Sequence, residues 1–293
     1  MAWQQLTIAT NPDLAPSFET LLEELGSLSV TMTDGEDQPI YEPPLNTTPL
    51  WQQVLVTGLF DEDTDLSQAS QYFERRIGSA DNWQLSIERL EDQVWERVWL
   101  EDFKPIKFGK NFWVCSTEHE NPEANATILT LDPGLAFGTG THPTTALCLE
   151  WLANTSLDNI EIIDFGCGSG ILAIAGLIMG ARHAIGIDID PQALTATINN
   201  AKQNHVRGKI EVYDAQQYPR SPQEIVVANI LAEPLTSLST EISALVKPSG
   251  HLLLSGILSE QVDGVVQAYQ DEFTFDPAMI QDNWACLHAV KKN

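Results

Sequence analysis

The sequence predicts an α/β protein in two parts, a small α+β unit followed by a larger domain built on a parallel sheet. Up to residue 90, the apolar periodicities follow the order strand, helix, strand, strand, helix, strand. Beyond the short strands expected within residues 104–132, strands and helices alternate, which indicates a doubly wound parallel sheet. The chain has 293 residues, which suits two domains of about 100 to 200 residues each.

Residues 1–90 match the ferredoxin-like layout, in which two helices cover one face of a small sheet. The expected strands have alternating apolar residues, and the expected helices have apolar residues at helical spacing. In chain order these are strand 3–10, helix 13–25, strand 27–33, strand 53–60, helix 65–77 and strand 83–90. Such a domain has no chemistry of its own, so its function must come from its surface.

Residues 91–103 contain neither proline nor glycine, and we expect a linker helix here. Four apolar side chains fall on one side of it: Val94, Trp95, Val98 and Trp99. This arrangement is more typical of interdomain packing than of a ligand platform.

Residues 104–293 form the predicted larger domain. The expected strands lie within 104–115 and at 127–132, 162–165, 183–188, 210–213, 224–228, 250–255, 273–280 and 284–290. The expected helices lie at 170–179, 191–204, 233–246 and 260–269, with another that begins near residue 143 and runs through residue 152. In such a sheet a ligand binds at the carboxyl ends of the strands.

The predicted binding site centres on residues 162–172, where an apolar strand meets three alternating glycines and then an apolar helix. Gly166, Gly168 and Gly170 permit a sharp turn and let a ligand lie against bare main chain, and the helix that follows offers unpaired N–H groups. A dinucleotide fingerprint would need glycine at position 171, where this chain has Ile171. Glycine turns also occur for packing alone.

The next strand ends in Asp188, 22 residues beyond Gly166. An acidic side chain at this distance can accept hydrogen bonds from both hydroxyls of a ribose. Asp190 and Pro191 already supply an N-cap and a first-turn proline for the following helix, which leaves Asp188 for a ligand. The two features together indicate a nucleotide-sized site.

The segments DFGCGSG (164–170) and GIDIDP (186–191) resemble the cofactor motifs of the class I methyltransferases, which bind S-adenosyl-L-methionine. The segments DPGLAFGTGTHPTT (132–145) and VANILA (227–232) resemble the PrmA family of methyltransferases, which modify protein eleven of the large ribosomal subunit. The resemblance covers the whole chain. It implies a Rossmann-like catalytic domain with a reversed last strand, and a first domain that recognises the substrate protein.

The resemblance also assigns site residues. Gly166, Gly168, Asp188 and Thr145 are expected to contact the cofactor. Asn229, at the end of the fourth strand, lies where related enzymes place the residue that faces the methyl group, so it is expected to contact the cofactor and to act in catalysis. Related enzymes that act on amino or amide groups often carry Asn/Asp-Pro-Pro-Tyr/Phe at this point, whereas this chain continues as Ile-Leu. A flexible amine is therefore a better candidate substrate than a flat base or a glutamine amide.

The resemblance thus implies an S-adenosyl-L-methionine-dependent protein N-methyltransferase that acts on lysine and N-terminal amino groups of a basic large-subunit ribosomal protein. Two alternatives belong to other classes. One is a non-enzymatic cofactor-binding protein of ribosome assembly, and the other is an NAD-dependent oxidoreductase, whose fingerprint Ile171 breaks.

Two side chains near the predicted site have more than one interpretation. Asp214 follows the third strand, where it is either a contact for the adenine amino group or a turn residue. His142 precedes a helix-starting proline and is more typical of a cap or a packing group than of a base or a metal ligand. The loop 137–145 lacks the lysine that a phosphate-binding P-loop requires, and its glycines and hydroxyls suit a cover over a cofactor.

The composition sets broad limits on partners and location. A net charge of −26, from 41 acidic and 15 basic residues, argues against direct nucleic acid binding and favours a cationic partner. The same acidity also keeps a surface well solvated. No segment resembles a leader or approaches the roughly 20 apolar residues that cross a bilayer, so a cytoplasmic protein without membrane contact is expected. The four cysteines lack metal-ligand spacing, which favours reduced thiols and no metal site.

Overall fold

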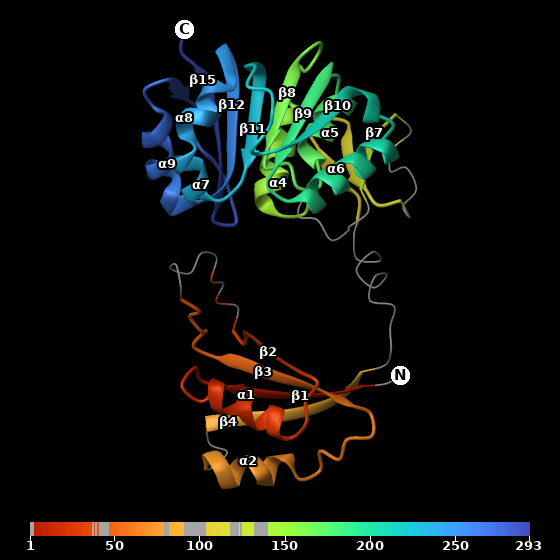
Figure 1. The fold of residues 1–293 in the computed structure, drawn as a ribbon, viewed down its shortest axis with the longest axis vertical. Coiled ribbons are helices and arrows are strands. Elements are labelled where there is room, and N and C mark those ends of the chain that lie inside the picture. Colours follow the sequence, from red (N-terminus) through yellow and green to blue (C-terminus); the bar gives the residue numbers. More distant parts are fainter. Residues whose placement is uncertain are drawn as a thin grey trace. The chain divides into compact units, whose positions relative to one another are not determined.

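The computed structural model describes residues 3–36, 38, 40, 47–78, 82–90, 104–117, 123, 125–131 and 140–293. The chain divides into two compact units, Met1–Trp95 and Glu96–Asn293 (Figure 1). The predicted linker helix, 91–103, lies outside the described residues, as do residues 132–139 of the motif segment 132–145. The boundary between the units falls within that predicted linker.

The first unit has the predicted ferredoxin-like topology. Its strands are β1 (Trp3–Thr10), β2 (Ser29–Asp34), β3 (Val54–Asp61) and β4 (Trp83–Leu90), and its helices are α1 (Ala15–Glu24) and α2 (Ala69–Ile77). The sheet order is β2-β3-β1-β4, with every neighbouring pair antiparallel. Both helices share one apolar core with the sheet, in which Phe18, Phe73 and Trp83 meet edge to face at 5.6–6.0 Å.

The second unit begins with a small sheet of three strands in the order β5-β6-β7. These are β5 (Ile106–Phe108), β6 (Phe112–Cys115) and β7 (Thr127–Thr130). Their inward side chains, among them Phe112 and Leu129, join the apolar cluster that contains Leu149 and Ile171 of the helices described next.

The main sheet has the strand order β10-β9-β8-β11-β12-β15-β13, and β14 also pairs with β15. Its strands are β8 (Glu161–Phe165), β9 (His183–Asp188), β10 (Ile210–Asp214), β11 (Gln223–Asn229), β12 (Val246–Leu258), β13 (Phe273–Phe275), β14 (Met279–Gln281) and β15 (Trp284–Lys291). The pairs from β10 to β12 are parallel, whereas β15 is antiparallel to β12, which confirms the predicted reversed last strand.

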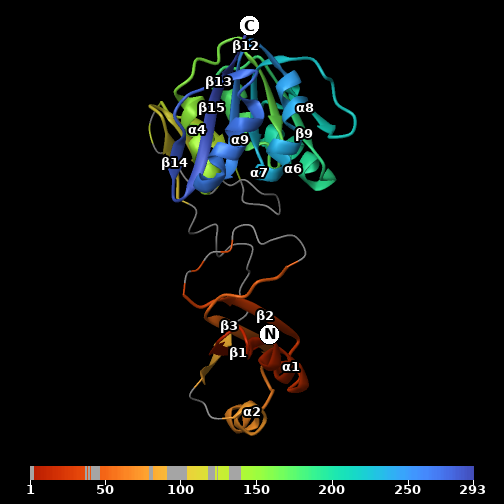
Figure 2. The ribbon, with the colours of Figure 1, turned by 90° about the vertical axis from the view of Figure 1, so that its left-hand side faces the viewer.

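Helices cover both faces of this sheet (Figures 1 and 2). They are α4 (Pro143–Ala153), α5 (Ile171–Ile178), α6 (Pro191–Gln203), α7 (Ala232–Ser237), α8 (Ser239–Ala244) and α9 (Val262–Tyr269). The first three contribute to one apolar cluster and the last three to another. In β11, Ile225 and Val227 face the first cluster, and Val226 and Ala228 face the second. The middle of this strand is continuously apolar because both of its faces are buried.

Several element boundaries differ from the predictions, and the predicted strand 273–280 is two strands, β13 and β14. The predicted helix 233–246 is two short helices, because the hydroxyls of Thr236 and Ser237 bond to nearby helix carbonyls and compete with the regular backbone pattern. The predicted helix 65–77 begins only at residue 69, after a turn in which the Asp65 carboxylate accepts the Ser67 N–H. β12 is longer than predicted because it continues past a bulge to pair with the end of β15.

Candidate functional site

A cavity of about 1010 Å³ lies at the carboxyl ends of β8, β9 and β11. Its size and position suit a cofactor in an open α/β sheet. All five predicted site residues line it: Thr145, Gly166, Gly168, Asp188 and Asn229. The fold thus brings together side chains that are up to 84 positions apart in the chain.

The glycine turn between β8 and α5 is closely packed. Gly166, Gly168 and Gly170 have φ values of +80°, +55° and +77°, in the left-handed region that glycine tolerates best. A Cβ on Gly166 would lie 2.3 Å from Cγ2 of Ile230, and one on Gly170 would lie 2.7 Å from Cγ2 of Thr197. At both positions a side chain is therefore excluded by contact as well as by backbone conformation.

Asp188 is bound to this turn. Its Oδ2 accepts the Gly168 N–H at 2.8 Å, and its Oδ1 accepts the Asp190 N–H at 3.0 Å. A carboxylate has about four acceptor positions, so each oxygen can still accept a ligand hydroxyl. Asp190 caps α6 through the Gln192 N–H at 2.8 Å, as predicted.

Asp164 is a candidate that the sequence analysis did not single out. It lies one residue before the end of β8, is only 1% exposed and lines the cavity. Its Oδ2 accepts the Ala173 N–H at 3.0 Å, whereas its Oδ1 has no hydrogen-bond partner among the described residues. Burial, reinforced by the nearby Asp188 charge, raises the pKa of Asp164 to about 7. The available signal was a carboxylate inside the apolar run of β8, two residues before the first glycine.

Asn229 and Thr145 contact each other inside the cavity. The Asn229 amide Nδ2 donates to Thr145 Oγ1 at 3.2 Å, and Thr145 is 3% exposed. Because this bond orients the amide group, Asn229 is a preset hydrogen-bonding side chain at the end of β11.

His142 is the N-cap of α4, which confirms the interpretation as a cap. Its Nδ1 accepts the Thr144 N–H at 3.4 Å and lies 2.8 Å from Thr144 Oγ1, and its ring packs against Trp284 with centroids 4.9 Å apart. Burial lowers the pKa of His142, which favours the neutral ring. Because Nδ1 is the accepting nitrogen, the ring proton belongs on Nε2.

Asp214 bonds within its own turn. Its Oδ1 accepts the Gln216 N–H at 2.8 Å, and its side chain is exposed. Among the described residues, it is Ala215 and not Asp214 that lines the cavity. This geometry favours the turn interpretation over an adenine contact.

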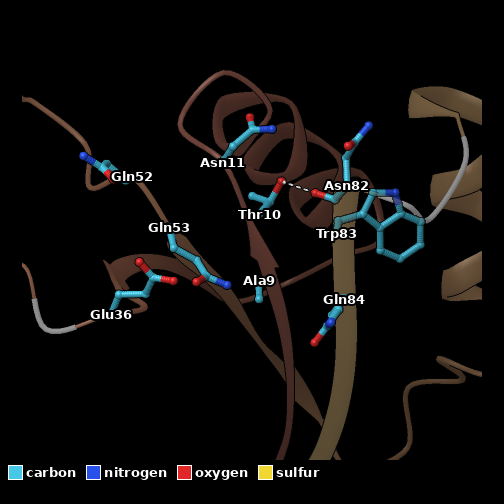
Figure 3. Close-up of a pocket in the computed structure, with 9 residues that line it drawn as sticks. All are labelled: Ala9, Thr10, Asn11, Glu36, Gln52, Gln53, Asn82, Trp83 and Gln84. Carbon is cyan, nitrogen blue, oxygen red and sulfur yellow. Dashed lines mark hydrogen bonds between the residues drawn. The ribbon is translucent and has the colours of Figure 1, made fainter.

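A second, smaller hollow of about 430 Å³ lies at one end of the first unit's sheet (Figure 3). Uncharged polar side chains dominate its lining, and Glu36 is the one carboxylate among the described residues there. Thr10 Oγ1 donates to the Asn82 carbonyl at 3.4 Å across it. The hollow therefore offers hydrogen bonds but few charges.

The described residues contain no group of three or more His, Cys, Asp or Glu that is arranged to hold a metal ion. All four cysteines are free and buried, and the sulfurs of Cys148 and Cys286 lie 3.9 Å apart. No helix in the described ranges is both long enough and apolar enough to cross a bilayer.

Known proteins are similar to this chain over nearly its whole length. The family model for ribosomal protein L11 methyltransferase (PrmA) matches residues 2–292. The chain is 50% identical over 293 residues to the ribosomal protein L11 methyltransferase of Ectopseudomonas mendocina (strain ymp), with 100% of both chains covered. It is 49% identical to that of Histophilus somni (strain 129Pt), over 97% of this chain and 96% of the relative.

A solved structure agrees with these relatives. The crystal structure of ribosomal protein L11 methylase from Lactobacillus delbrueckii subsp. bulgaricus matches with a TM-score of 0.58 and 28% identity, and it covers 65% of this chain and 100% of that one. The sheet order, the composition of the cavity and the matched family model agree, and the chain belongs to the ribosomal protein L11 methyltransferase (PrmA) family.

Proposed function

We propose that this methyltransferase transfers methyl groups from S-adenosylmethionine to lysine and N-terminal amino groups of ribosomal protein L11. The observation that carries the proposal is the cavity, which joins two carboxylates, a glycine turn and an amide side chain at the carboxyl edge of the sheet. A relative that matches over its full length is named ribosomal protein L11 methyltransferase. The cytoplasm, where ribosomes are made, is the corresponding location.

The residues in the cavity fit the cofactor. S-adenosylmethionine has a ribose diol and an ammonium group, so it needs acceptors for two hydroxyls and an anionic partner for the ammonium. Asp188 has free acceptor positions for the hydroxyls. Asp164 has an unpartnered oxygen buried in the cavity lining, which an ammonium group would satisfy. Gly166 and Gly168 offer main chain that a ligand can approach closely.

The cofactor supplies a methyl group on a sulfonium, which is already a strong leaving group. The task of the protein is then to hold a neutral amine in line and to keep water out. Asn229, oriented by Thr145, would accept a hydrogen bond from the amine through its amide oxygen. An amide is not a base, and the Nδ1 of His142 is occupied by its cap. The incoming amine would therefore lose its proton to solvent before it docks.

We assign substrate recognition to residues 1–90. This segment has its own apolar core and carries 15 acidic and three basic side chains, which suits a basic ribosomal protein. The rest of the chain would bind the cofactor and perform the transfer.

Intact-mass analysis tests the proposal. Purified enzyme, S-adenosylmethionine and recombinant L11 should yield L11 with one or more added methyl masses, and peptide mapping should place them on lysine and N-terminal amines. Reactions without cofactor provide the blank. If the enzyme binds the cofactor but adds no mass to L11, the non-enzymatic alternative replaces this proposal.

A further inference from the structure

Helix α6 contacts the glycine turn through two polar side chains. Thr197 Oγ1 donates to the carbonyl oxygen of Gly168 at 3.0 Å, and Asn200 Nδ2 donates to that of Ser169 at 2.8 Å. Neither Thr197 nor Asn200 is among the described residues that line the cavity, whereas Gly168 is. The helix, which packs across β9 and β10 (Figure 1), thus holds the turn from outside the cavity.

The Thr197 contact is not a routine feature of a helical threonine. Such hydroxyls commonly bond back to a carbonyl of their own helix, as Thr195 of α6 does to Pro191 at 2.9 Å. Thr197 instead bonds outside the helix and is completely buried. Asparagine is also a poor residue for a helix interior, so the bond from Asn200 offsets a local cost.

These bonds fix the peptide groups on both sides of Gly168. The N–H of Gly168 donates to Asp188 Oδ2 at 2.8 Å, and its C=O accepts from Thr197. Because a trans peptide directs its C=O and N–H to opposite sides, holding a carbonyl on α6 also sets the direction of the next N–H. The bond from Gly170 N–H to the Cys167 carbonyl at 2.7 Å closes the turn.

Thr197 also contacts the turn by packing. A Cβ on Gly170 would lie 2.7 Å from its Cγ2 and 2.8 Å from its Oγ1, and the Cys167 sulfur lies 3.4 Å from its hydroxyl. Three glycines within five residues lose much conformational entropy when they are ordered. A turn that is already held in place spares the ligand that cost.

We infer that Thr197 and Asn200 are positioning residues for the cofactor, which strengthen its binding without touching it by holding the turn in its binding conformation. The inference rests on the proposed contact between this turn and the cofactor.

Calorimetric titration of the full-length protein with S-adenosylhomocysteine tests this role. Thr197→Val keeps the shape and removes the donor, and Asn200→Ala removes the amide. Each should raise the dissociation constant about 3- to 10-fold, the usual worth of one neutral hydrogen bond. Thr197→Ser retains the hydroxyl and should bind nearly as the wild type does.

Two neighbours on the same helix are matched controls. Thr195→Val removes a hydroxyl that bonds only to its own helix, and Asn199→Ala removes an exposed amide with the same change in helix propensity as Asn200→Ala. Both should change the dissociation constant less than about twofold. With substrate, Thr197→Val and Asn200→Ala should raise KM for the cofactor while kcat at saturating cofactor is kept.

Circular dichroism melting separates this role from a merely structural one. A lower melting temperature with an unchanged dissociation constant for the folded variants would overturn the inference, as would equal weakening by the controls. If Thr197→Val does not fold, Asn200→Ala, at a half-buried position, decides the question alone. A wild type that fails to bind S-adenosylhomocysteine would overturn the proposed cofactor site itself, and this inference with it.

Discussion

Asp164 shows how strongly burial changes a single side chain. Its carboxyl group is almost completely buried, and desolvation raises its pKa to about 7. Folding therefore favours the protonated form. The stability that comes from keeping Asp164 protonated in the folded state is fully present below the unfolded pKa of about 3.9, and it is lost as the pH rises through about 7.

This pKa predicts how cofactor affinity depends on pH. A ligand ammonium binds the ionised carboxylate, so below pH 7 binding must first remove a proton from Asp164. Affinity for S-adenosylhomocysteine should fall about tenfold per pH unit below pH 7 and level off above it. Calorimetry across this range should show the slope in the wild type and, beginning at lower pH because the Asp188 charge is removed, in Asp188→Asn, but not in Asp164→Asn. A slope that survives in Asp164→Asn would assign the proton to another group.

Asp188 and Asn229 should separate binding from catalysis. Asp188→Ala removes a charged acceptor for the ribose and should weaken cofactor binding by about 1.5 to 3 kcal/mol. Asn229→Ala should lower the single-turnover rate of methyl transfer with a smaller effect on affinity. Thr145→Val should lower that rate in the same direction, because it removes the hydroxyl that orients the amide. Unchanged affinity in a folded Asp188→Ala variant would refute the ribose assignment.

At the scale of elements, the apolar pattern predicted some bounds correctly and missed others. The strands at 83–90 and 183–188 have the predicted bounds, because alternation or a continuous apolar run shows directly which faces are buried. The end of α7 depends on where two hydroxyls find acceptors, which periodicity does not reveal. The unpartnered Asp164 oxygen and the bonds from Thr197 and Asn200 to the glycine turn likewise depend on contacts between segments distant in the sequence. The glycine turn and Asp188, in contrast, were recognisable as motifs.

The bulge in β12 supports the site through Gly256. This residue has φ +83°, and a Cβ there would lie 2.3 Å from the carbonyl oxygen of Ile230, which follows Asn229. Gly256→Ala should destabilise the protein by about 1 to 3 kcal/mol and lower the rate of methyl transfer. The control is Gly264→Ala in α9, where nothing lies within 4 Å of the new Cβ. That change should stabilise the protein by about 0.5 to 1 kcal/mol. Equal denaturant midpoints for both variants would contradict the prediction.

At the scale of the whole molecule, recognition and catalysis are assigned to different units. A shortened chain that begins near Asp92 retains the cavity and both cores of the larger unit. It should bind S-adenosylhomocysteine with an affinity close to that of the full chain and lose methylation of L11. Calorimetry measures the binding of S-adenosylhomocysteine, and intact-mass analysis measures the methylation of L11. If the shortened chain methylates L11 at the full rate, residues 1–90 have another role.

The separate core of the first unit has a consequence for heat denaturation. A protein with two independent cores need not melt in one cooperative step, so differential scanning calorimetry should resolve two heat-absorption peaks. A ligand stabilises only the unit that binds it, by about 2.7 kcal/mol when its concentration is 100 times the dissociation constant. The melting temperature of that unit alone then rises. S-adenosylhomocysteine should therefore move one peak and leave the other in place. Two peaks that move together would show that the units unfold as one.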